Sequence, residues 1–234
     1  MDLSKLLTIV IPCKNENGVI DLTLNLLNNQ TDINNVKVII SDSSNDNTTY
    51  NLETRLNDKF KLDIIQGGLP SIARNNGARR TETSYILFID ADMYLLDKDL
   101  LTESMKLMKD EELDLLTVKV RTTNGKYNYV FRFFDLIQHI TKYFSPFCLG
   151  GFMLIKKETF DNLGGFDETA VVAEDYLLSK QISGRRFKIH NKTVFTLPRR
   201  FENKGIWYMT KLMIQSFFNR NNKKFFENHK TYWK

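Results

Sequence analysis

Short apolar runs alternate along the first half of the chain with segments whose apolar residues recur at helical spacing. The runs, rich in β-branched residues, cover residues 7–11, 36–41, 62–66, 85–89 and 115–120. Helical segments are expected at about 18–29, 71–80 and 97–109, with a further helix start at 46–48. Strands and helices that alternate in this way are typical of a mostly parallel sheet with helices on both faces. The sequence therefore predicts an α/β fold that binds ligands at the carboxyl ends of its strands.

The second half of the chain is less regular. Residues 127–147 are rich in aromatic side chains and predict a helix with one apolar side, formed by Phe131, Phe134, Ile137 and Ile140. Further elements are expected as a strand at 152–155, a helix at 174–182, one or two strands at 187–197 and an amphipathic helix at about 205–218. A basic, aromatic tail follows that helix.

Two groups of acidic residues come directly after or at the start of predicted elements. Asp90 and Asp92 follow the run at 85–89, and on extended chain residues i and i+2 point the same way. A hard cation such as Mn²⁺ or Mg²⁺ accepts one or two such carboxylates together with phosphate oxygens and water. The alternative is a solvated strand end. Glu174 and Asp175 begin a predicted helix, where the alternative is helix capping by acidic side chains.

The composition is that of an ordinary globular protein. The 234 residues, 42% hydrophobic and 26% charged, fit one large domain or one domain with a small appendage. A net charge of +5 suits phosphorylated ligands, an anionic membrane or nucleic acid, without separating them. The two cysteines, Cys13 and Cys148, lack the spacing of a zinc or disulfide scaffold. Because no apolar run approaches the roughly 20 residues of a membrane span, we expect a cytoplasmic protein.

Several nucleotide-dependent enzyme classes are disfavoured by missing motifs. The first predicted strand is followed by Pro-Cys-Lys-Asn-Glu-Asn-Gly and not by the Gly-x-Gly-x-x-Gly of a Rossmann dehydrogenase. The Gly-Lys-Ser/Thr of a P-loop kinase is absent. The glycine-rich arginine loop of a sugar-nucleotide pyrophosphorylase is also missing.

Five short motifs occur in order along the chain. They are IVIPCKNE at 9–16, SDSSNDNT at 41–48, ARNNGA at 73–78, FIDAD at 88–92, and GGFDE at 164–168 followed by AED at 173–175. Each motif is weak alone, but together they resemble glycosyltransferase family 2, the inverting transferases with a GT-A fold, over about residues 7–201. The resemblance implies a GT-A domain at 1–204, with a nucleotide-sugar half to about 122 and an acceptor half at 123–204. Residues 205–234 would form the C-terminal helix and tail.

The resemblance also implies a donor site. Its nucleotide-sugar residues would be Pro12, Asn15, Glu16, Asp42, Arg74, Asp90, Arg199 and Arg200. Asp42 would hydrogen-bond the base and Arg74 would face the phosphates, although a turn residue and a solvated helix residue are the alternatives. Arg199-Arg200 resembles a late basic motif whose guanidinium groups suit a diphosphate. Asp92, with Asp90, would bind Mn²⁺ or Mg²⁺.

On the acceptor side, the resemblance makes Glu174 and Asp175 the acidic pair of catalysis. Adjacent residues at a helix start point about 100° apart, so they are expected to have different tasks. We assign Asp175 as the general base and Glu174 to acceptor or loop contacts. Three residues, Gly150, Gly151 and Phe152, would border the acceptor sugar; ordinary turn glycines are the alternative.

The expected function is metal-dependent, inverting transfer of a single sugar from a nucleotide-diphosphate sugar, with a UDP-sugar favoured. The acceptor would be a hydroxyl of a glycan or lipid-linked molecule, and no nucleic acid is expected. Residues 181–187 do not reproduce the Gln-x-x-Arg-Trp motif of processive members, which favours single-sugar transfer. The alternative function is a nucleotide-sugar-binding pseudoenzyme. His190 is left outside the metal set, because a lone histidine in an alternating stretch is more often structural.

The aromatic and basic residues at 131–147 and 217–234 suit a membrane interface. Peripheral contact with the cytoplasmic face of a membrane is therefore one interpretation of these two segments. The alternative is an aromatic core segment followed by a solvated basic terminus.

Overall fold

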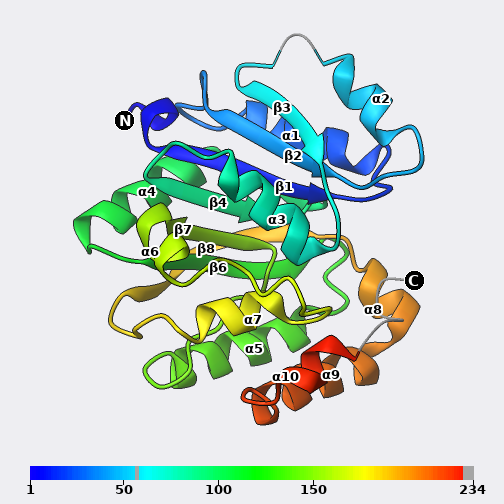
Figure 1. The fold of residues 1–234 in the computed structure, drawn as a ribbon, viewed down its shortest axis with the longest axis vertical. Helices are drawn as coiled ribbons and strands as arrows, with labels where there is room; N and C mark the ends of the chain where they lie inside the picture. The colour runs from blue at the N-terminus through cyan, green and yellow to red at the C-terminus, as the bar shows by residue number, and fades with distance from the viewer. Residues whose placement is uncertain (56–57, 229–234) are drawn as a thin grey trace.

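The computed structural model describes residues 1–55 and 58–228, and within them eight strands form one sheet (Figure 1). The strands lie in the order β3-β2-β1-β4-β7-β6-β8-β5. Their bounds are β1 Leu7–Cys13, β2 Lys37–Asp42, β3 Lys61–Gln66, β4 Tyr85–Ile89, β5 Met93–Tyr94, β6 Leu115–Thr122, β7 Phe152–Lys156 and β8 Phe187–Thr196. The α/β architecture expected from the alternating pattern is confirmed.

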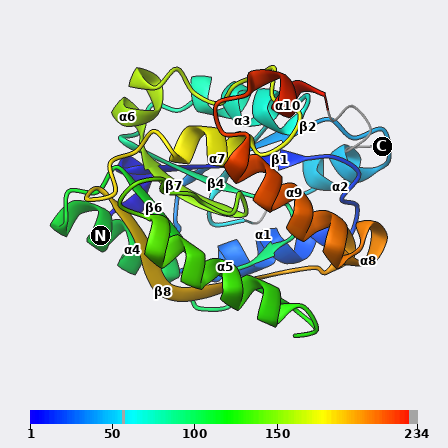
Figure 2. The ribbon, with the colours of Figure 1, turned by 90° about the horizontal axis from the view of Figure 1, so that it is seen from below.

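The helices pack on both sides of this sheet and extend below it in Figure 1. A short 3₁₀ turn at Leu3–Lys5 precedes β1. The helices are α1 Val19–Asn28, α2 Thr48–Glu53, α3 Pro70–Arg79, α4 Leu100–Asp110, α5 Asn128–Thr141, α6 Lys157–Asn162, α7 Glu174–Ser179, α8 Arg199–Lys204, α9 Ile206–Phe218 and α10 Lys223–Glu227. In Figure 2, which views the molecule from below, α5 and α9 both face the reader.

The pairing changes direction at β7. The strands β3, β2, β1 and β4 are parallel, and so are β6 and β8. The strand β7 lies between these two groups and runs antiparallel to both β4 and β6. The short β5, which the sequence pattern does not predict, pairs antiparallel with β8. A buried apolar strand has the same composition in either direction, so its orientation is set by the connections and not by its pattern.

The central strand β1 is buried on both faces, as a strand of a parallel sheet requires. Ile9 and Ile11 belong to the core under α1 and α4, whereas Val10 belongs to the core on the opposite face. Helix α3 packs against that second face so closely that a Cβ on Gly77 would lie 2.3 Å from Val10 Cγ1. Glycine at this position therefore allows the close approach that places the side chains of α3 beside the ends of β1 and β4.

Three local expectations differ from the structure. Asp90 and Asp92 lie after the end of β4 in a turn, not on extended chain, because the chain reverses there to enter β5. Ile140 is 61% exposed and does not share the buried side of Phe131 and Phe134. The helix expected at 174–182 ends at Ser179.

The remaining expected elements occur with boundary shifts of a few residues, and 187–197 is one strand, β8, with a register shift in β6 opposite it. No helix among the described residues is long and apolar enough to cross a membrane. The proposed division of the chain at residue 204 stays a prediction, and the end of the basic tail, residues 229–234, lies outside the described residues.

Candidate active site

A cavity of about 830 Å³ opens where the loops after β1 and β4 meet α3, α5, the start of α7, α8 and α9. The structure brings most of the predicted site residues to its wall. These are Pro12, Asn15, Glu16, Arg74, Asp90, Asp92, Gly150, Gly151, Glu174, Asp175, Arg199 and Arg200. Two others, Asp42 and Phe152, do not line it. The cavity therefore joins distant segments of the chain, and Glu16 and Arg199, which are 183 residues apart, are hydrogen-bonded in its wall.

Arg74 connects the end of β4 to the start of α7. Its side chain is buried, and its guanidinium donates to Asp90 Oδ1 at 2.6 Å and to Glu174. The Arg74 Nε atom has no hydrogen-bond partner among the described residues. Phe166 lies 5.5 Å from the guanidinium carbon and closes one side of the group. Because two carboxylates from different elements bind one rigid cation, the positions of Asp90 and Glu174 are fixed relative to each other.

Asp175 lies directly against Gly150. A Cβ at Gly150 would be only 2.8 Å from Asp175 Oδ2 and 3.4 Å from Arg74 Nη2. Burial raises the pKa of Asp175 to about 7, and the neighbouring Glu174 carboxylate acts in the same direction while Arg74 opposes it. A carboxylate that titrates near neutral pH can take up a proton during a reaction, which its ordinary acidic counterpart does poorly.

The backbone before α7 holds the two acidic residues apart. Ala173 has a φ of +55°, in the left-handed region that a residue with a Cβ adopts at an energetic cost. Glu174 then points to Arg74, and Asp175 points to Gly150. The two carboxylates occupy different places, as the helical rotation between adjacent residues requires.

Asn75 anchors the glycine-rich loop that leads to α7. Its Nδ2 atom donates to the Phe166 carbonyl and to Glu168 Oε1, both at 2.9 Å, and its Oδ1 accepts from the Phe166 N–H at 3.0 Å. A Cβ on Gly165 would lie 2.8 Å from the same Oδ1. These contacts explain why the ARNNGA and GGFDE motifs occur together: the second folds onto the first.

A group of carboxylates and an arginine forms the polar wall of the cavity. Arg199 Nη2 donates to both carboxylate oxygens of Glu16 at 2.9 and 2.7 Å and to Asp92 Oδ2 at 3.3 Å. Burial raises the pKa of Asp92, and Asp90 adds to the shift. Burial also raises the pKa of Glu16, against the effect of Arg199 and with that of Asp92 and Asp90. The carboxylates are thus crowded, and a cation beside them lowers their mutual repulsion.

This wall fits a hard divalent cation. Asp90 and Asp92 supply two carboxylates with oxygen donors, the type that Mn²⁺ and Mg²⁺ prefer. In the described part of the chain no three His, Cys, Asp or Glu side chains gather closely enough to hold a metal ion by themselves. The arrangement therefore suits a cation that takes one or two protein carboxylates and completes its coordination with phosphate oxygens and water.

Asp42 holds the loop after β2. Its Oδ1 accepts from the Ser44 N–H at 3.0 Å, and its Oδ2 accepts from the Thr49 hydroxyl. Asn15, which also has a positive φ of 55°, exchanges hydrogen bonds with the same loop through Ser44 Oγ and the Asn45 N–H. In this structure the Asp42 carboxylate supports a loop at the edge of the site, and its predicted contact with a base stays a prediction.

Two further residues lie away from the cavity wall. The Phe152 side chain is fully buried in the core, so only its glycine neighbours border the cavity. His190 is on β8 and packs against α4, with Nδ1 3.3 Å from Ser104 Oγ. His190 does not line the cavity, and its exclusion from the metal set stays a prediction.

Much of the cavity is apolar, which the sequence pattern does not predict. Phe131 and Phe134 of α5 and Met209 and Leu212 of α9 line it, beside Phe147. The helical spacing of these residues was visible in the sequence, but it predicts only a buried side of each helix. A helix side that faces a packed core and one that faces a cavity have the same pattern.

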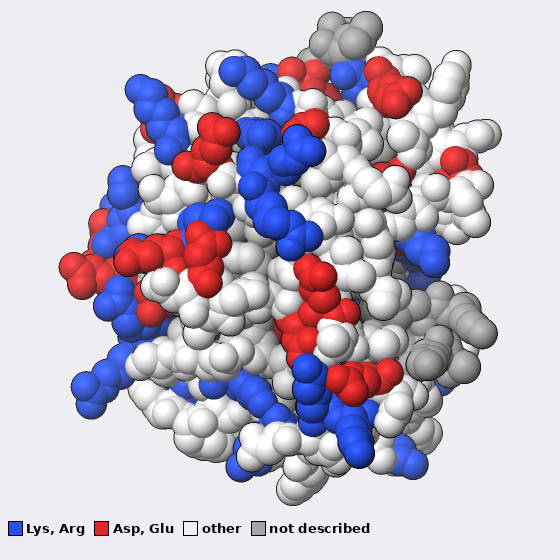
Figure 3. Space-filling view, viewed as in Figure 1, with Lys and Arg blue, Asp and Glu red and all other residues white. Residues whose placement is uncertain are grey.

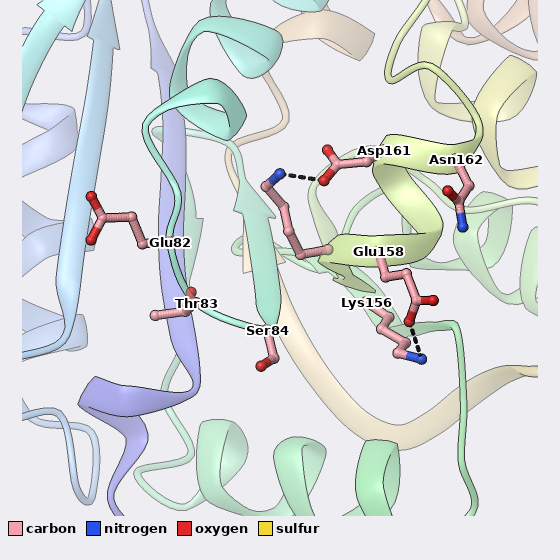
Figure 4. A pocket seen from close by; sticks show the side chains of 8 residues that line it. Glu82, Thr83, Ser84, Lys156, Glu158, Asp161 and Asn162 are labelled. Carbon is pink, nitrogen blue, oxygen red and sulfur yellow. Dashed lines mark hydrogen bonds and ion pairs between the residues drawn. The ribbon is translucent and has the colours of Figure 1, made fainter.

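A second hollow, of about 450 Å³, lies at the amino end of β4 (Figure 4). Four of its charged groups form ion pairs: Lys156 with Glu158 at 2.7 Å, and Lys157 with Asp161. In an open α/β sheet ligands bind at the carboxyl ends of the strands, where the larger cavity lies. The larger cavity is therefore the candidate site.

Comparisons with known proteins agree with this geometry. Residues 8–164 match the sequence model described as Glycosyl transferase family 2. Poly(ribitol-phosphate) β-N-acetylglucosaminyltransferase TarS of Staphylococcus aureus is 24% identical over 124 residues, which is 51% of this chain and 22% of that protein. The chain thus spans about a fifth of the length of the curated relatives that it matches.

Solved structures share the fold. The crystal structure of Staphylococcus aureus TarS has a TM-score of 0.65 at 20% identity, over 92% of this chain and 43% of that one. The mannosyltransferase PcManGT of Pyrobaculum calidifontis, in complex with GDP-Man and Mn²⁺, has a TM-score of 0.71 at 19% identity, over 90% and 60%. Glucosyl-3-phosphoglycerate synthase of Mycobacterium tuberculosis, with Mn²⁺, UDP-Glc and phosphoglyceric acid, has a TM-score of 0.65 at 16% identity, over 94% and 80%. These likenesses confirm the GT-A fold.

Proposed function

Because the chain belongs to glycosyltransferase family 2, we propose that it transfers a single sugar from a nucleotide-diphosphate sugar to an acceptor hydroxyl, with inversion at the anomeric carbon. A UDP-sugar is the favoured donor, since structures of its relatives hold UDP, UDP-GlcNAc and UDP-Glc, although one relative holds GDP-Man. The acceptor is a glycan or a lipid-linked molecule. A cytoplasmic location stays a prediction.

The observation that carries the proposal is the position of Asp175. Its carboxylate lies against Gly150, shares the wall with Arg74, and has a pKa raised to about 7 by burial. The cavity continues from this carboxylate to the carboxylates at the ends of β1 and β4, so a donor and an acceptor can meet in it. A site for binding alone has no use for a base placed away from the donor carboxylates.

In the proposed reaction, the acceptor hydroxyl oxygen attacks the anomeric carbon from the side opposite the diphosphate. The bond from that carbon to the diphosphate oxygen breaks, and the electron pair leaves with the nucleoside diphosphate. Asp175 takes the hydroxyl proton. Glu174 holds Arg74, and Arg74 holds Asp90, so the base and the donor wall keep their relative positions.

Asp92 and Asp90 would hold Mn²⁺ or Mg²⁺, which when bound supplies positive charge to the departing diphosphate. The Mn²⁺ in two relatives supports this assignment. Arg199 and Arg200 line the same wall and would bind the diphosphate through their guanidinium groups. When the diphosphate is present, Arg199 is expected to share its contacts between the phosphates and Glu16.

The first test is a thermal-shift panel of nucleoside diphosphates and nucleotide sugars, with Mn²⁺ or with chelator. A ligand that binds only the folded state raises its melting temperature by mass action. A shift with one nucleotide, lost in chelator, would identify the donor class, and release of that nucleoside diphosphate with an acceptor would show turnover. Binding without turnover over a wide acceptor panel would favour the nucleotide-sugar-binding pseudoenzyme. No shift with any nucleotide would contradict the donor site.

A further inference from the structure

Helix α5 exposes a stripe of large apolar side chains along its outer face. Tyr129, Phe133, Leu136 and Ile140 are 61%, 50%, 58% and 61% exposed, and they recur at the spacing of one helical face. Tyr143 and Phe144, 69% and 68% exposed, continue the stripe beyond the end of the helix. A soluble surface carries isolated exposed apolar residues, but a stripe of large apolar side chains of this length indicates a binding surface.

Helix α9 carries a second stripe. Trp207, Ile214 and Phe218 are 87%, 44% and 76% exposed, with the exposed Lys211 between the first two. These four positions again follow one face of a helix. The helix has another, buried side, formed by Met209, Leu212 and Ser216. Of the exposed residues, Ile214 and Phe218 also line the cavity, so this stripe reaches the opening of the cavity.

The two stripes lie on the same side of the molecule. Helices α5 and α9 are both at the bottom of Figure 1 and both face the reader in Figure 2. The inner face of α5 lines the apolar part of the cavity, and α9 lines it through buried residues such as Met209 and Leu212 and through the exposed Ile214 and Phe218. We call the exposed residues 129, 133, 136, 140, 143 and 144 with 207, 214 and 218 the α5–α9 face. This face lies next to the end of the cavity that would take the acceptor.

The charges on the α5–α9 face are positive. Asp135 is the only acidic residue in α5 and α9, and it is buried in an ion pair with Arg121. Arg132 and Lys211 are exposed on these helices. Lys142 lies 4.6 Å from the ring centroid of Tyr143, so a cation and an aromatic ring are adjacent at the end of the stripe. The lower edge of Figure 3 shows Lys and Arg among residues of other kinds, without Asp or Glu.

We propose that the α5–α9 face binds an anionic membrane surface, with the aromatic side chains inserted at the headgroup level. Exposed aromatic rings combined with Lys and Arg suit the interface of an anionic bilayer. A second copy of the chain would instead bring like charges together. This docking would place the acceptor end of the cavity at the bilayer, where a lipid-linked acceptor can enter. The proposal extends the proposed function but does not require turnover.

The experiment is sedimentation of the chain with unilamellar vesicles of phosphatidylcholine, with and without 30% phosphatidylserine, in the absence of nucleotide. The wild-type chain should bind the anionic vesicles in preference to the neutral ones. Ile140→Ser/Tyr143→Ser should weaken binding about tenfold or more, since moving one large apolar side chain out of water contributes about tenfold. A weakening of less than twofold would overturn the insertion of these residues.

The control variant is Leu96→Ser/Tyr50→Ser. Leu96 and Tyr50 are 62% and 69% exposed, close to the 61% and 69% of Ile140 and Tyr143, but they lie outside α5 and α9. This variant removes the same exposed apolar groups and should bind vesicles like the wild type. Equal losses in both variants would mean non-specific adhesion and would overturn the proposal.

The charge is tested in the same way. Arg132→Glu/Lys211→Glu should lose anionic-vesicle binding by well over tenfold, because each basic residue near such a surface contributes about fivefold. Lys106→Glu/Lys109→Glu, which changes the charge equally on exposed residues of α4, should change binding by less than threefold. Equal effects of the two pairs would show that net charge alone drives binding and would contradict docking through this face.

Sedimentation velocity without vesicles tests whether a second copy of the chain, and not a membrane, binds the α5–α9 face. A dimer that Ile140→Ser/Tyr143→Ser dissociates, with no vesicle binding by the wild type, would assign the face to a second copy. The vesicle assay contains no donor, so a chain that does not bind vesicles would contradict membrane docking and would leave the transferase proposal standing. A chain that binds vesicles but no nucleotide would contradict only the latter.

Discussion

The cavity has two walls that hold their residues by different forces. The wall at the ends of β1 and β4 is polar, and there Arg74 and Arg199 each bind two carboxylates. The wall from α5 and α9 is apolar, with Phe131, Met209 and their neighbours facing the cavity. Ion pairs fix atoms at defined distances, whereas apolar side chains adapt to the shape of what they contact.

This difference suggests that the two walls bind different molecules, the donor and the acceptor. The polar wall suits a ligand of constant chemistry, the diphosphate and its cation. The apolar wall suits an acceptor that has a large apolar part. Asp175 lies where the two meet, so changes in the polar wall should alter donor binding, and a change at Asp175 should alter chemistry alone.

The largest effect is expected from Asp175→Asn. An amide cannot take the hydroxyl proton, so turnover should fall by about a thousandfold. The donor dissociation constant should change by less than about twofold, since the carboxylates that form ion pairs with Arg74 and Arg199 are Asp90, Glu174, Glu16 and Asp92 and not Asp175. Steady-state kinetics and calorimetric titration with the donor measure the two quantities.

The matched control is Asp161→Asn on α6, which makes the same chemical change at an exposed ion pair far from the cavity. It should leave turnover unchanged. Near-normal turnover by Asp175→Asn would show that Asp175 is not the base. It would also contradict the expectation that a change where the two walls meet alters the chemical step.

A smaller effect, on the other wall, is expected from Asp92→Asn. The loss of one carboxylate should weaken donor binding in Mn²⁺ by at least about tenfold, because ligation of the cation depends on that charge. In chelator the variant and the wild type should bind the donor equally. Equal binding in Mn²⁺ as well would contradict the assignment of Asp92 to the cation.

Gly150→Ala tests the junction of the walls. The new Cβ would lie 2.8 Å from Asp175 Oδ2 and would displace that carboxylate, so turnover should fall about tenfold. Gly125→Ala is the control: it adds backbone strain at a φ of +71° with its nearest neighbour at 3.7 Å. It should lower the melting temperature without changing turnover. A Gly150→Ala enzyme with wild-type kinetics would mean that Asp175 tolerates movement.

The smallest effect concerns pH. Because burial raises the pKa of Asp175 to about 7, kcat/KM should rise with pH and reach half its maximum near pH 7. Glu174→Gln removes a negative charge that contributes to this shift, so its midpoint should move to lower pH. A pH–rate profile from pH 5.5 to 9 measures both. An unmoved midpoint would show that Glu174 acts only through Arg74.

The same shift has a consequence for stability. Between pH 3.8, the ordinary pKa of an aspartate, and about pH 7, Asp175 is protonated in the folded state and ionised in the unfolded state. The free energy of unfolding therefore decreases as the pH rises through this range and has lost this contribution above about pH 7. Asp175→Asn should therefore melt at a higher temperature than the wild type at pH 8 and not at pH 4. If Asp175 is a buried base, the Asp175→Asn variant should lose activity and gain stability at pH 8.

The sequence was sufficient for much of the fold. The apolar runs gave the strands β1, β2, β3, β4 and β6, because a strand buried on both faces leaves a continuous apolar run. The direction of β7 was not predictable, because its run Phe152 to Ile155 has the same pattern in either direction. The turn at Asp90–Asp92 was also missed, since the short β5 has only two residues and no pattern of its own.

The candidate site was predictable as a set of residues and not as an arrangement. Motif order pointed to Arg74, Asp92 and Asp175 without their contacts. Local periodicity describes how neighbours in the chain are oriented, whereas contacts across a hundred residues depend on how whole elements pack.

By itself, the sequence determined the order of most of the longer strands and helices, the family, and the residue types available for chemistry. Only the tertiary structure decided that Arg74 binds both Asp90 and Glu174, that Arg199 reaches Glu16 across 183 residues, and that α5 turns one apolar side to the cavity and another to solvent. The physical reason is that an amphipathic pattern records which side of a helix avoids water, and the packing of distant segments decides what that side meets.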